Sequence, residues 1–316
     1  MRRAAAAMRS RHLLAIVLSA LLASIGLVGW WLSAPFLGAV ARSKPSSGGS
    51  PAPAVGIHKV KDTSWRPDLG QPLFIAVLGS DVRSGPPGGG GGRCDAIHIV
   101  AINPRARAGT ILNFPRDAYV DIPGRGKDKI NAACVPGADL MVQTLKNLTG
   151  IPIQYYVMTE FSHFIRVIDE LGGLDIDIPY AMNDASSGAN FAPGPRHLPG
   201  GDLLAFSRNR HDAPRGDFGR TANQGLVILA GLAKFRAETS ADPHRVFDYL
   251  KAARRNTAIS VPITETIRLG LLARDIDPAA VRSMTIDGSI GQAGSASVVY
   301  LSPGDIYTRV RDDGIY

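Results

Sequence analysis

The sequence predicts an α/β protein in which helices cover both sides of a sheet, preceded by one N-terminal transmembrane helix. Two observations support this prediction. Strand-length runs rich in Ile and Val are interleaved with segments whose apolar residues recur at helical spacing. Before them, residues 12–31 form an apolar run that is long enough to cross a bilayer and carries no formal charge beyond a histidine at its edge.

The apolar run is interpreted as an uncleaved anchor over residues 12–33. Four arginines lie in residues 1–11, and this positive charge predicts a cytoplasmic N-terminus and an extracytoplasmic remainder, located at the cell membrane. The alternative is a cleaved signal peptide, because small residues such as Ala34 follow the run. The run is longer than a usual signal-peptide core, which favours the anchor.

Residues 34–58 have the Ser, Gly and Pro content of a linker. Residues 59–316 are long enough to bury one large core, so they are predicted to form a single extracytoplasmic domain. The net charge is +8. For an exported domain this charge favours anionic lipid or a polyanionic wall polymer as partner, and nucleic acid is not expected.

The predicted strands come first in the domain. Residues 73–79, 96–102 and 110–114 are short apolar runs of the kind found in buried strands. Residues 154–159 and 281–287 have similar length, and 174–179 alternates apolar with acidic residues, as a strand with one polar face does.

The predicted helices follow from apolar spacing and from glycines that end them. Glycines close the segments 137–150 and 161–173. A long amphipathic helix is expected from Asp217 to about residue 238, and further helices are expected at 243–254 and 262–274. Residues 85–91 are nearly all Gly and Pro and are expected to form a flexible loop.

Two aspartates flank this glycine-rich loop. Asp81 and Arg83 follow the first strand, and Asp95 stands just before the second. If the two strands are antiparallel neighbours, both carboxylates lie at one edge of the sheet. Such a pair is a plausible Mg²⁺ site when phosphate oxygens supply the remaining ligands. Each aspartate alone is more commonly a turn or cap residue, and it is their pairing that makes a metal site about equally well supported.

The segment SRNRHDAPRGDFGR, residues 207–220, gathers four arginines. If its start is extended, Arg208 and Arg210 point to the same side. If a helix begins near Asp217, Arg220 lies in its first turn and Gln224 follows on the same face. The segment is therefore predicted to bind a phosphate-like anion, since guanidinium groups match phosphate oxygens. The same spacing does not place Arg215 on the side that faces the anion.

The sequence contains two cysteines, Cys94 and Cys134. Both fall in the part predicted to be exported, where a disulfide is favoured over two buried thiols. His98 lies inside a strand pattern and is interpreted as a packed residue. Motifs of zinc proteases, thioredoxin-like proteins, P-loop proteins and serine hydrolases are absent from the sequence.

Taken in order, five blocks of the sequence resemble the LytR-CpsA-Psr family of cell-wall proteins over about residues 73–236. The blocks are FIAVLGSDVR, RCDAIHIVAINP, ILNFPRDAYVDIPGRGKDKINAAC, GIPIQYYVMTEFSHFIRVIDELGGLDIDIP and LLAFSRNRHDAPRGDFGRTANQ. The resemblance implies an α-β-α layered sandwich with a central mixed sheet, anchored by one helix. It also implies an apolar groove for a polyprenyl pyrophosphate.

The resemblance assigns roles to the candidate residues by motif. Asp81 and Asp95 match the aspartates that serve metal and pyrophosphate, and Arg116 matches the arginine of the PRD block. The pyrophosphate is expected to be bound by Arg83, Arg116, Arg208, Arg210, Arg220 and Gln224. Asp81, Asp95 and Arg116 are the predicted catalytic residues, with Mg²⁺ as the cofactor.

The implied function is the Mg²⁺-assisted transfer of a glycopolymer from polyprenyl pyrophosphate to a sugar hydroxyl of peptidoglycan. A hydrolase of the same lipid carrier and a non-catalytic binding protein for lipid or wall polymer are the alternatives. The chain departs from the family pattern where RSD and KINAAY read RCD and KINAAC, and both changes introduce a cysteine. No second C-terminal domain of the kind some members carry is expected.

Overall fold

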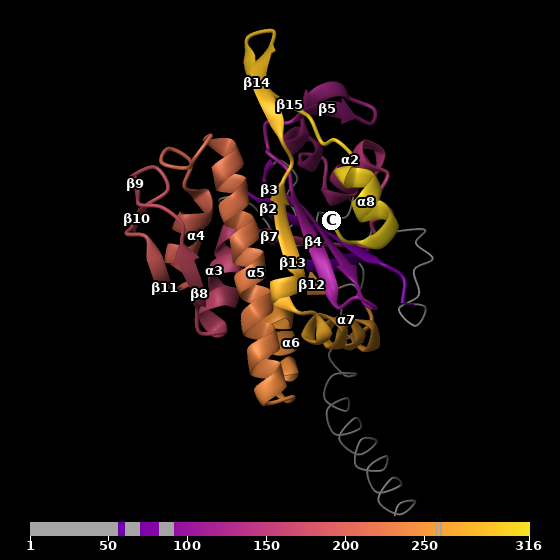
Figure 1. Cartoon of the computed structure of the whole chain (residues 1–316), viewed down its shortest axis with the longest axis vertical. Coiled ribbons are helices and arrows are strands. Elements are labelled where there is room, and N and C mark those ends of the chain that lie inside the picture. Colours follow the sequence, from indigo (N-terminus) through magenta and orange to yellow (C-terminus); the bar gives the residue numbers. More distant parts are fainter. Residues whose placement is uncertain (1–55, 61–69, 82–91, 257, 260) are drawn as a thin grey trace, which may run out of the picture. The chain divides into compact units, whose positions relative to one another are not determined.

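The computed structural model describes residues 56–60, 70–81, 92–256, 258–259 and 261–316 (Figure 1). Four predicted features lie outside the described residues: the anchor 12–33, the segment 1–11 that is predicted to be cytoplasmic, most of the linker, and Arg83. Within the described part, none of the helices is both long and apolar enough to cross a membrane. Residues 51–316 belong to one compact unit.

A seven-stranded mixed sheet forms the centre of this unit (Figure 1). Neighbouring strands are parallel in the pairs β12–β1, β7–β2 and β4–β13 and antiparallel in the other three pairs. In spatial order the strands are β12 (Ala258–Ile259), β1 (Gly56–Lys59), β7 (Tyr155–Glu160), β2 (Leu73–Ser80), β3 (Cys94–Asn103), β4 (Ala108–Asn113) and β13 (Val281–Thr285). The strands expected at 73–79, 96–102, 110–114, 154–159 and 281–287 are confirmed.

Side-chain alternation along β2 supplies a core to each face of the sheet. Phe74, Ala76 and Leu78 face a cluster that includes residues of α2 (Ala138–Thr149) and α8 (Ile306–Asp313). Ile75 packs into a second cluster on the opposite face, with residues of α5 (Asp217–Ala241) and α7 (Ile263–Asp275). The sheet is thus covered by helices on both faces, as expected from interleaved strands and helices.

A further group of elements packs beside α5 and builds a third apolar cluster. It consists of α3 (Phe161–Glu170), α4 (Gly200–Arg208), the pair β8 (Leu174–Ile178) with β11 (Gly194–Leu198), and the pair β9 (Met182–Asp184) with β10 (Ala189–Phe191). Helix α6 (Arg245–Asn256) follows α5. The expected helices at 137–150, 161–173, 217–238, 243–254 and 262–274 and the strand at 174–179 are confirmed, whereas α4 was not predicted.

Two hairpins lie near the end of the sheet where β2 ends and β3 begins. One pairs β5 (Tyr119–Ile122) with β6 (Gly126–Lys129), and the other pairs β14 (Gly288–Ala293) with β15 (Ala296–Leu301). Figure 1 shows β14 and β15 projecting beyond the sheet, next to β5. The short helices η2 (Ile130–Cys134) and η3 (Pro278–Ala280) complete the elements of the described residues.

A disulfide joins Cys94, the first residue of β3, to Cys134, the last residue of η2. The two Cα atoms are 5.6 Å apart, and both cysteines are buried in the cluster under α2. The bond ties the start of the strand that carries Asp95 to the segment between β6 and α2.

Candidate functional site

The two aspartates singled out in the sequence lie at one edge of the sheet. Strands β2 and β3 are antiparallel neighbours, and the Asp81 backbone N–H donates to Arg93 O at 3.1 Å. Gly79 pairs with Ala96 while Ser80 pairs with Cys94, so Asp95 is the extra residue of a β-bulge. A bulge breaks the strict alternation of side chains and can re-aim one of them. Asp81 and Asp95 line the same cavity.

Arg116 is held by two carboxylates from different elements. Its Nη1 lies 2.6 Å from Asp95 Oδ1, and its backbone N–H donates to Asp217 Oδ2 at 3.1 Å. Burial alone would lower the pKa of Arg116, but Asp95, Asp217 and Asp117 raise it. The guanidinium is therefore fixed and charged. Its closest ion-pair partner is Asp95, in strand β3, and not Asp117, the next residue in the sequence.

Arg220 lies in the first turn of α5, as predicted, and is 4% exposed. Its Nη2 is 2.6 Å from Asp217 Oδ1, while its Nε has no hydrogen-bond partner among the described residues. Burial and the positive charges of Arg116 and Arg210 lower the pKa of Arg220, against the attraction of Asp217. A buried guanidinium beside other cations is stabilised by an added anion.

The arginines at 208 and 210 reach the site differently from the prediction. The expectation of an extended Arg-Asn-Arg stretch was wrong, because Arg208 is the last residue of α4 and Asn209 caps that helix. Arg208 lies over the Phe161 ring, 5.2 Å from its centroid. Arg210 Nη2 lies 3.5 Å from Asp117 Oδ2. Both arginines nevertheless line the same cavity, although Arg208 belongs to a helix and Arg210 follows it.

Gln224 lies one turn after Arg220 on α5, on the same face, as the spacing predicted. Its Nε2 donates to Asp95 O and to Ser207 O, each at 3.2 Å. The amide thus connects α5 to β3 and α4. Arg215 points elsewhere: its Nη2 lies 2.9 Å from Asp287 Oδ1, and its guanidinium lies over the Phe218 ring.

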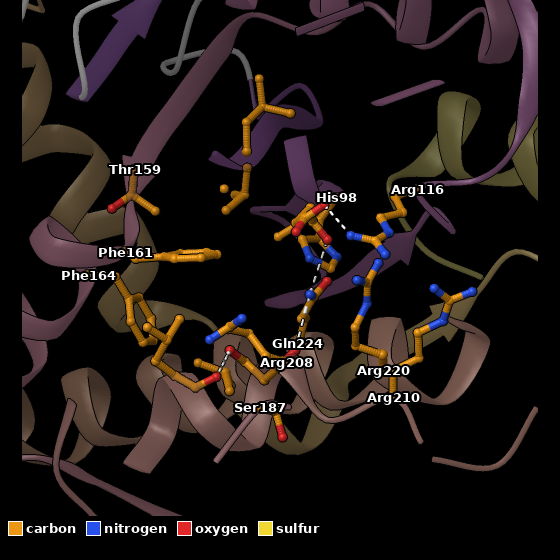
Figure 2. Close-up of a pocket in the computed structure, with 18 of the residues that line it drawn as sticks. His98, Arg116, Thr159, Phe161, Phe164, Ser187, Arg208, Arg210, Arg220 and Gln224 are labelled. Atoms are coloured by element: carbon orange, nitrogen blue, oxygen red, sulfur yellow. Dashed lines mark hydrogen bonds and ion pairs between the residues drawn. The ribbon is translucent and has the colours of Figure 1, made fainter. Parts of the chain in front are cut away.

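A cavity of about 310 Å³ opens between the sheet edge and helices α3, α4 and α5. We call it the apolar cavity, because residues such as Val77, Phe161, Phe164, Leu204 and Val227 line much of it. Figure 2 shows Arg116, Arg210 and Arg220 gathered on one side and Thr159, Phe161 and Phe164 on the other. Its lining also includes Asp95, His98, Arg208 and Gln224. The shape suits an amphiphile with an anionic head.

A second cavity of about 420 Å³, the polar cavity, lies at the same edge of the sheet. It shares Asp95, Arg116 and Arg210 with the apolar cavity, and these three residues form the shared wall. The rest of its lining is polar: Asp81, Arg93, Asp117, Lys129, Asn131 and Ser297. Lys129 Nζ lies 2.9 Å from Asp117 Oδ1, so Lys129 is paired at the site and is not merely solvated.

The donor set at the edge fits Mg²⁺. Asp81 Oδ1 accepts from the Arg93 N–H at 2.9 Å and Asp95 Oδ1 from Arg116, so each carboxylate has a second oxygen to offer. Mg²⁺ is commonly bound by one or two carboxylates, with water and substrate phosphate completing six oxygens. Among the described residues, no group of three or more His, Cys, Asp or Glu is placed to hold a metal.

Sequence reasoning missed the residues that organise the arginines. Asp217 is 5% exposed and connects Arg116 with Arg220, although its position suggested only a helix start. Asp217 stands three residues before Arg220, and this spacing on a helix could have indicated an ion pair between the two. Asp117 connects Lys129 with Arg210 across a turn that no local pattern encodes. Phe161 follows the end of β7 directly and Phe164 lies one turn later in α3, and both look like ordinary core residues in the sequence.

Residues 42–313 match the LytR_cpsA_psr family. A polyisoprenyl-teichoic acid–peptidoglycan teichoic acid transferase, TagU of Bacillus mycoides, is 36% identical over 190 residues, 59% of this chain and 59% of that protein. TagV of Bacillus subtilis, a transferase of the same name, is 31% identical over 67% of this chain and 56% of its own length. The chain therefore spans less than two thirds of these relatives.

Among solved structures, the crystal structure of B. subtilis TagV superposes with a TM-score of 0.66 at 29% sequence identity. The superposition covers 77% of this chain and 95% of the TagV chain. This chain and TagV therefore share the same fold as well as sequence similarity.

Proposed function

This chain belongs to the LytR_cpsA_psr family, and from that premise we propose that it transfers a glycopolymer from a polyprenyl-pyrophosphate carrier to peptidoglycan. The TagU and TagV relatives are polyisoprenyl-teichoic acid–peptidoglycan teichoic acid transferases. The acceptor is a sugar hydroxyl of peptidoglycan.

One observation carries the proposal: an apolar cavity has arginines gathered on one side. The polyprenyl chain occupies the part lined by Phe161, Phe164 and Val227, where its burial is favourable by about 25 cal/mol per Å² of apolar surface. The diphosphate lies against Arg116, Arg208, Arg210 and Arg220. It adds negative charge beside the buried Arg220, whose Nε has no hydrogen-bond partner among the described residues, and it accepts bidentate hydrogen bonds from the guanidinium forks.

The reaction is a displacement at the phosphorus that bears the glycopolymer. The acceptor hydroxyl oxygen forms a bond to this phosphorus, and the bridging P–O bond breaks with its electron pair moving to polyprenyl phosphate. Asp95 or Asp81 takes the hydroxyl proton. The products are a phosphodiester between glycopolymer and peptidoglycan, and a polyprenyl monophosphate.

The arginines lower the barrier by stabilising charge that spreads over the phosphoryl oxygens. Arg116 is already oriented by Asp95 and Asp217 before substrate binds, so little reorganisation is needed during reaction. Asp81 and Asp95 would hold Mg²⁺, which would offset phosphate charge and the mutual repulsion of the carboxylates.

We further propose that the protein is held at the membrane by residues 12–33, with the domain on the extracytoplasmic side. A lipid-linked donor is confined to the membrane, so an anchored enzyme meets it without leaving the surface. Peptidoglycan lies on that same side. The four arginines before the apolar run support this orientation.

A reaction with labelled polyprenyl-pyrophosphate glycopolymer and peptidoglycan tests the proposal. We expect transfer by the wild-type protein, its loss on chelation of Mg²⁺, and its loss in Asp81→Ala and Asp95→Ala. Lipid binding is measured in parallel. If the wild-type protein binds the donor but never consumes it, the chain is a binding protein, and the proposed function is wrong.

A further inference from the structure

The polar cavity has features of a carbohydrate site that the donor lipid does not account for. Asp81, Asp95, Lys129 and Asn131 converge on it, and carboxylate, amide and ammonium groups are the partners that sugar hydroxyls and N-acetyl groups use. Asn131 is 4% exposed, and its Oδ1 has no hydrogen-bond partner among the described residues. A buried acceptor without a partner is costly, and a hydroxyl or amide N–H of a ligand would satisfy it.

We propose that the polar cavity binds the acceptor, a glycan segment of peptidoglycan, and presents its hydroxyl at the shared wall. This inference rests on the proposed function and names the place of its second substrate. Phosphoryl transfer brings the attacking oxygen in opposite the leaving oxygen. Because the leaving polyprenyl phosphate lies in the apolar cavity, the attacking hydroxyl must enter from the other side of the phosphorus. The polar cavity meets the apolar one at Asp95, Arg116 and Arg210.

The site continues in a direction that suits a polymer. A third cavity, of about 180 Å³, shares Asp117, Arg210 and Ser297 with the polar cavity. Strand β14 contributes Ile290 to it, and this side chain is 67% exposed. An exposed apolar side chain beside polar groups suits the apolar face of a sugar ring. Together the two cavities offer room for neighbouring sugars of one strand.

Position 297 allows the polar cavity to be blocked by a single substitution. Ser297 is exposed, lies on β15 and lines both the polar and the third cavity. A tryptophan at this position covers the cavity, and tryptophan is compatible with a strand. Ser295, in the turn of the same hairpin, is exposed and lines neither cavity. Ser297→Trp and Ser295→Trp are therefore a matched pair.

The experiment compares both variants with wild type as the full chain in detergent micelles. The probes are a lipid-linked glycopolymer as donor and a short soluble peptidoglycan oligosaccharide as acceptor. We expect Ser297→Trp to raise the KM for the oligosaccharide roughly tenfold or more. A change of this size corresponds to the loss of one or two hydrogen bonds between the oligosaccharide and the cavity. The Kd for the donor should stay unchanged, because Ser297 does not line the apolar cavity. Ser295→Trp should match wild type throughout.

Two results would overturn the inference. Equal KM values for the oligosaccharide in the two variants would mean that the cavity is not on the acceptor's path. A loss of donor affinity in Ser297→Trp alone would mean that the cavity holds the donor's own saccharide. Direct binding of the oligosaccharide is measured as well, with Asn131→Ala as an additional variant. If wild type makes no product, binding weakened in Ser297→Trp but not in Ser295→Trp still supports the inference, although the proposed function has failed.

Discussion

At the scale of single residues, the site consists of cations held in place by one buried and two half-buried carboxylates. Asp217 contacts Arg116 and Arg220, Asp95 contacts Arg116, and Asp117 contacts Lys129 and Arg210. Burial and the cationic neighbours of Arg220 nevertheless lower its pKa, against the attraction of Asp217. A polyanionic ligand bound beside these arginines would stabilise their positive charges.

Removing one of these cations should weaken the lipid site. We expect Arg210→Ala and Arg220→Ala each to reduce affinity for polyprenyl pyrophosphate ten- to a hundredfold, because a charge-assisted hydrogen bond is worth about 1.5 to 3 kcal/mol. Arg→Lys should recover only part of the loss, since lysine keeps the charge but not the fork. Arg215→Ala is the control, because its guanidinium pairs with Asp287. Unchanged affinity in both site variants would refute the assignment.

Stability should depend on pH through His98. Burial, with the charge of Arg220, lowers the pKa of His98 to about 4 from its ordinary 6.5, although hydrogen bonding of the ring to Asn113 Oδ1 and to Gln224 opposes the shift. Between these values the unfolded chain binds a proton that the folded protein does not. The free energy of unfolding should therefore fall by about 3 kcal/mol from pH 6.5 to 4.

Urea denaturation of wild type and His98→Gln over this pH range measures the effect. The variant lacks the titrating group, so the difference between the two free energies of unfolding should change with pH in the stated direction. Two curves that run parallel from pH 6.5 to 4 would show that His98 does not carry the dependence.

At the scale of elements, the sequence predicted the strands of the sheet core and the long helix α5 because burial imposes a clear period on them. The same reasoning placed Asp81 and Asp95 at one edge, since adjacent antiparallel strands bring an end and a start together. It failed for α4, which is nine residues long and starts with two glycines. The bulge at Asp95 and the hairpin β14–β15 depend on pairing between strands, which local periodicity does not encode.

The disulfide between β3 and η2 is the element-scale prediction. Cys94 and Cys134 are 40 residues apart, and closing a loop of that length stabilises the folded state by about 4 kcal/mol in the chain-entropy model. We expect reductant to lower the free energy of unfolding by about this amount. The double variant Cys94→Ala, Cys134→Ala should be insensitive to reductant. Intact-mass analysis that finds two alkylatable thiols without reductant would contradict the pairing.

At the scale of the whole molecule, we propose that residues 12–33 anchor a catalytic domain on the extracytoplasmic side, where peptidoglycan lies. The orientation rests on the arginines before residue 12 and on the uncharged run that follows them. A reporter that works only outside the cytoplasm, fused after Tyr316, should therefore be active. Activity of a reporter that works only inside the cytoplasm would reverse the topology and separate the domain from peptidoglycan.

The central claim is that one reaction joins the glycopolymer to peptidoglycan and releases the lipid. Its most direct test is to quantify both products after incubating the full chain with doubly labelled lipid-linked glycopolymer and peptidoglycan. The account predicts that polyprenyl monophosphate and a glycopolymer–peptidoglycan phosphodiester appear in equal amounts, and that Asp95→Ala forms neither. Polyprenyl monophosphate accompanied only by free glycopolymer would show that water is the acceptor and would contradict the account.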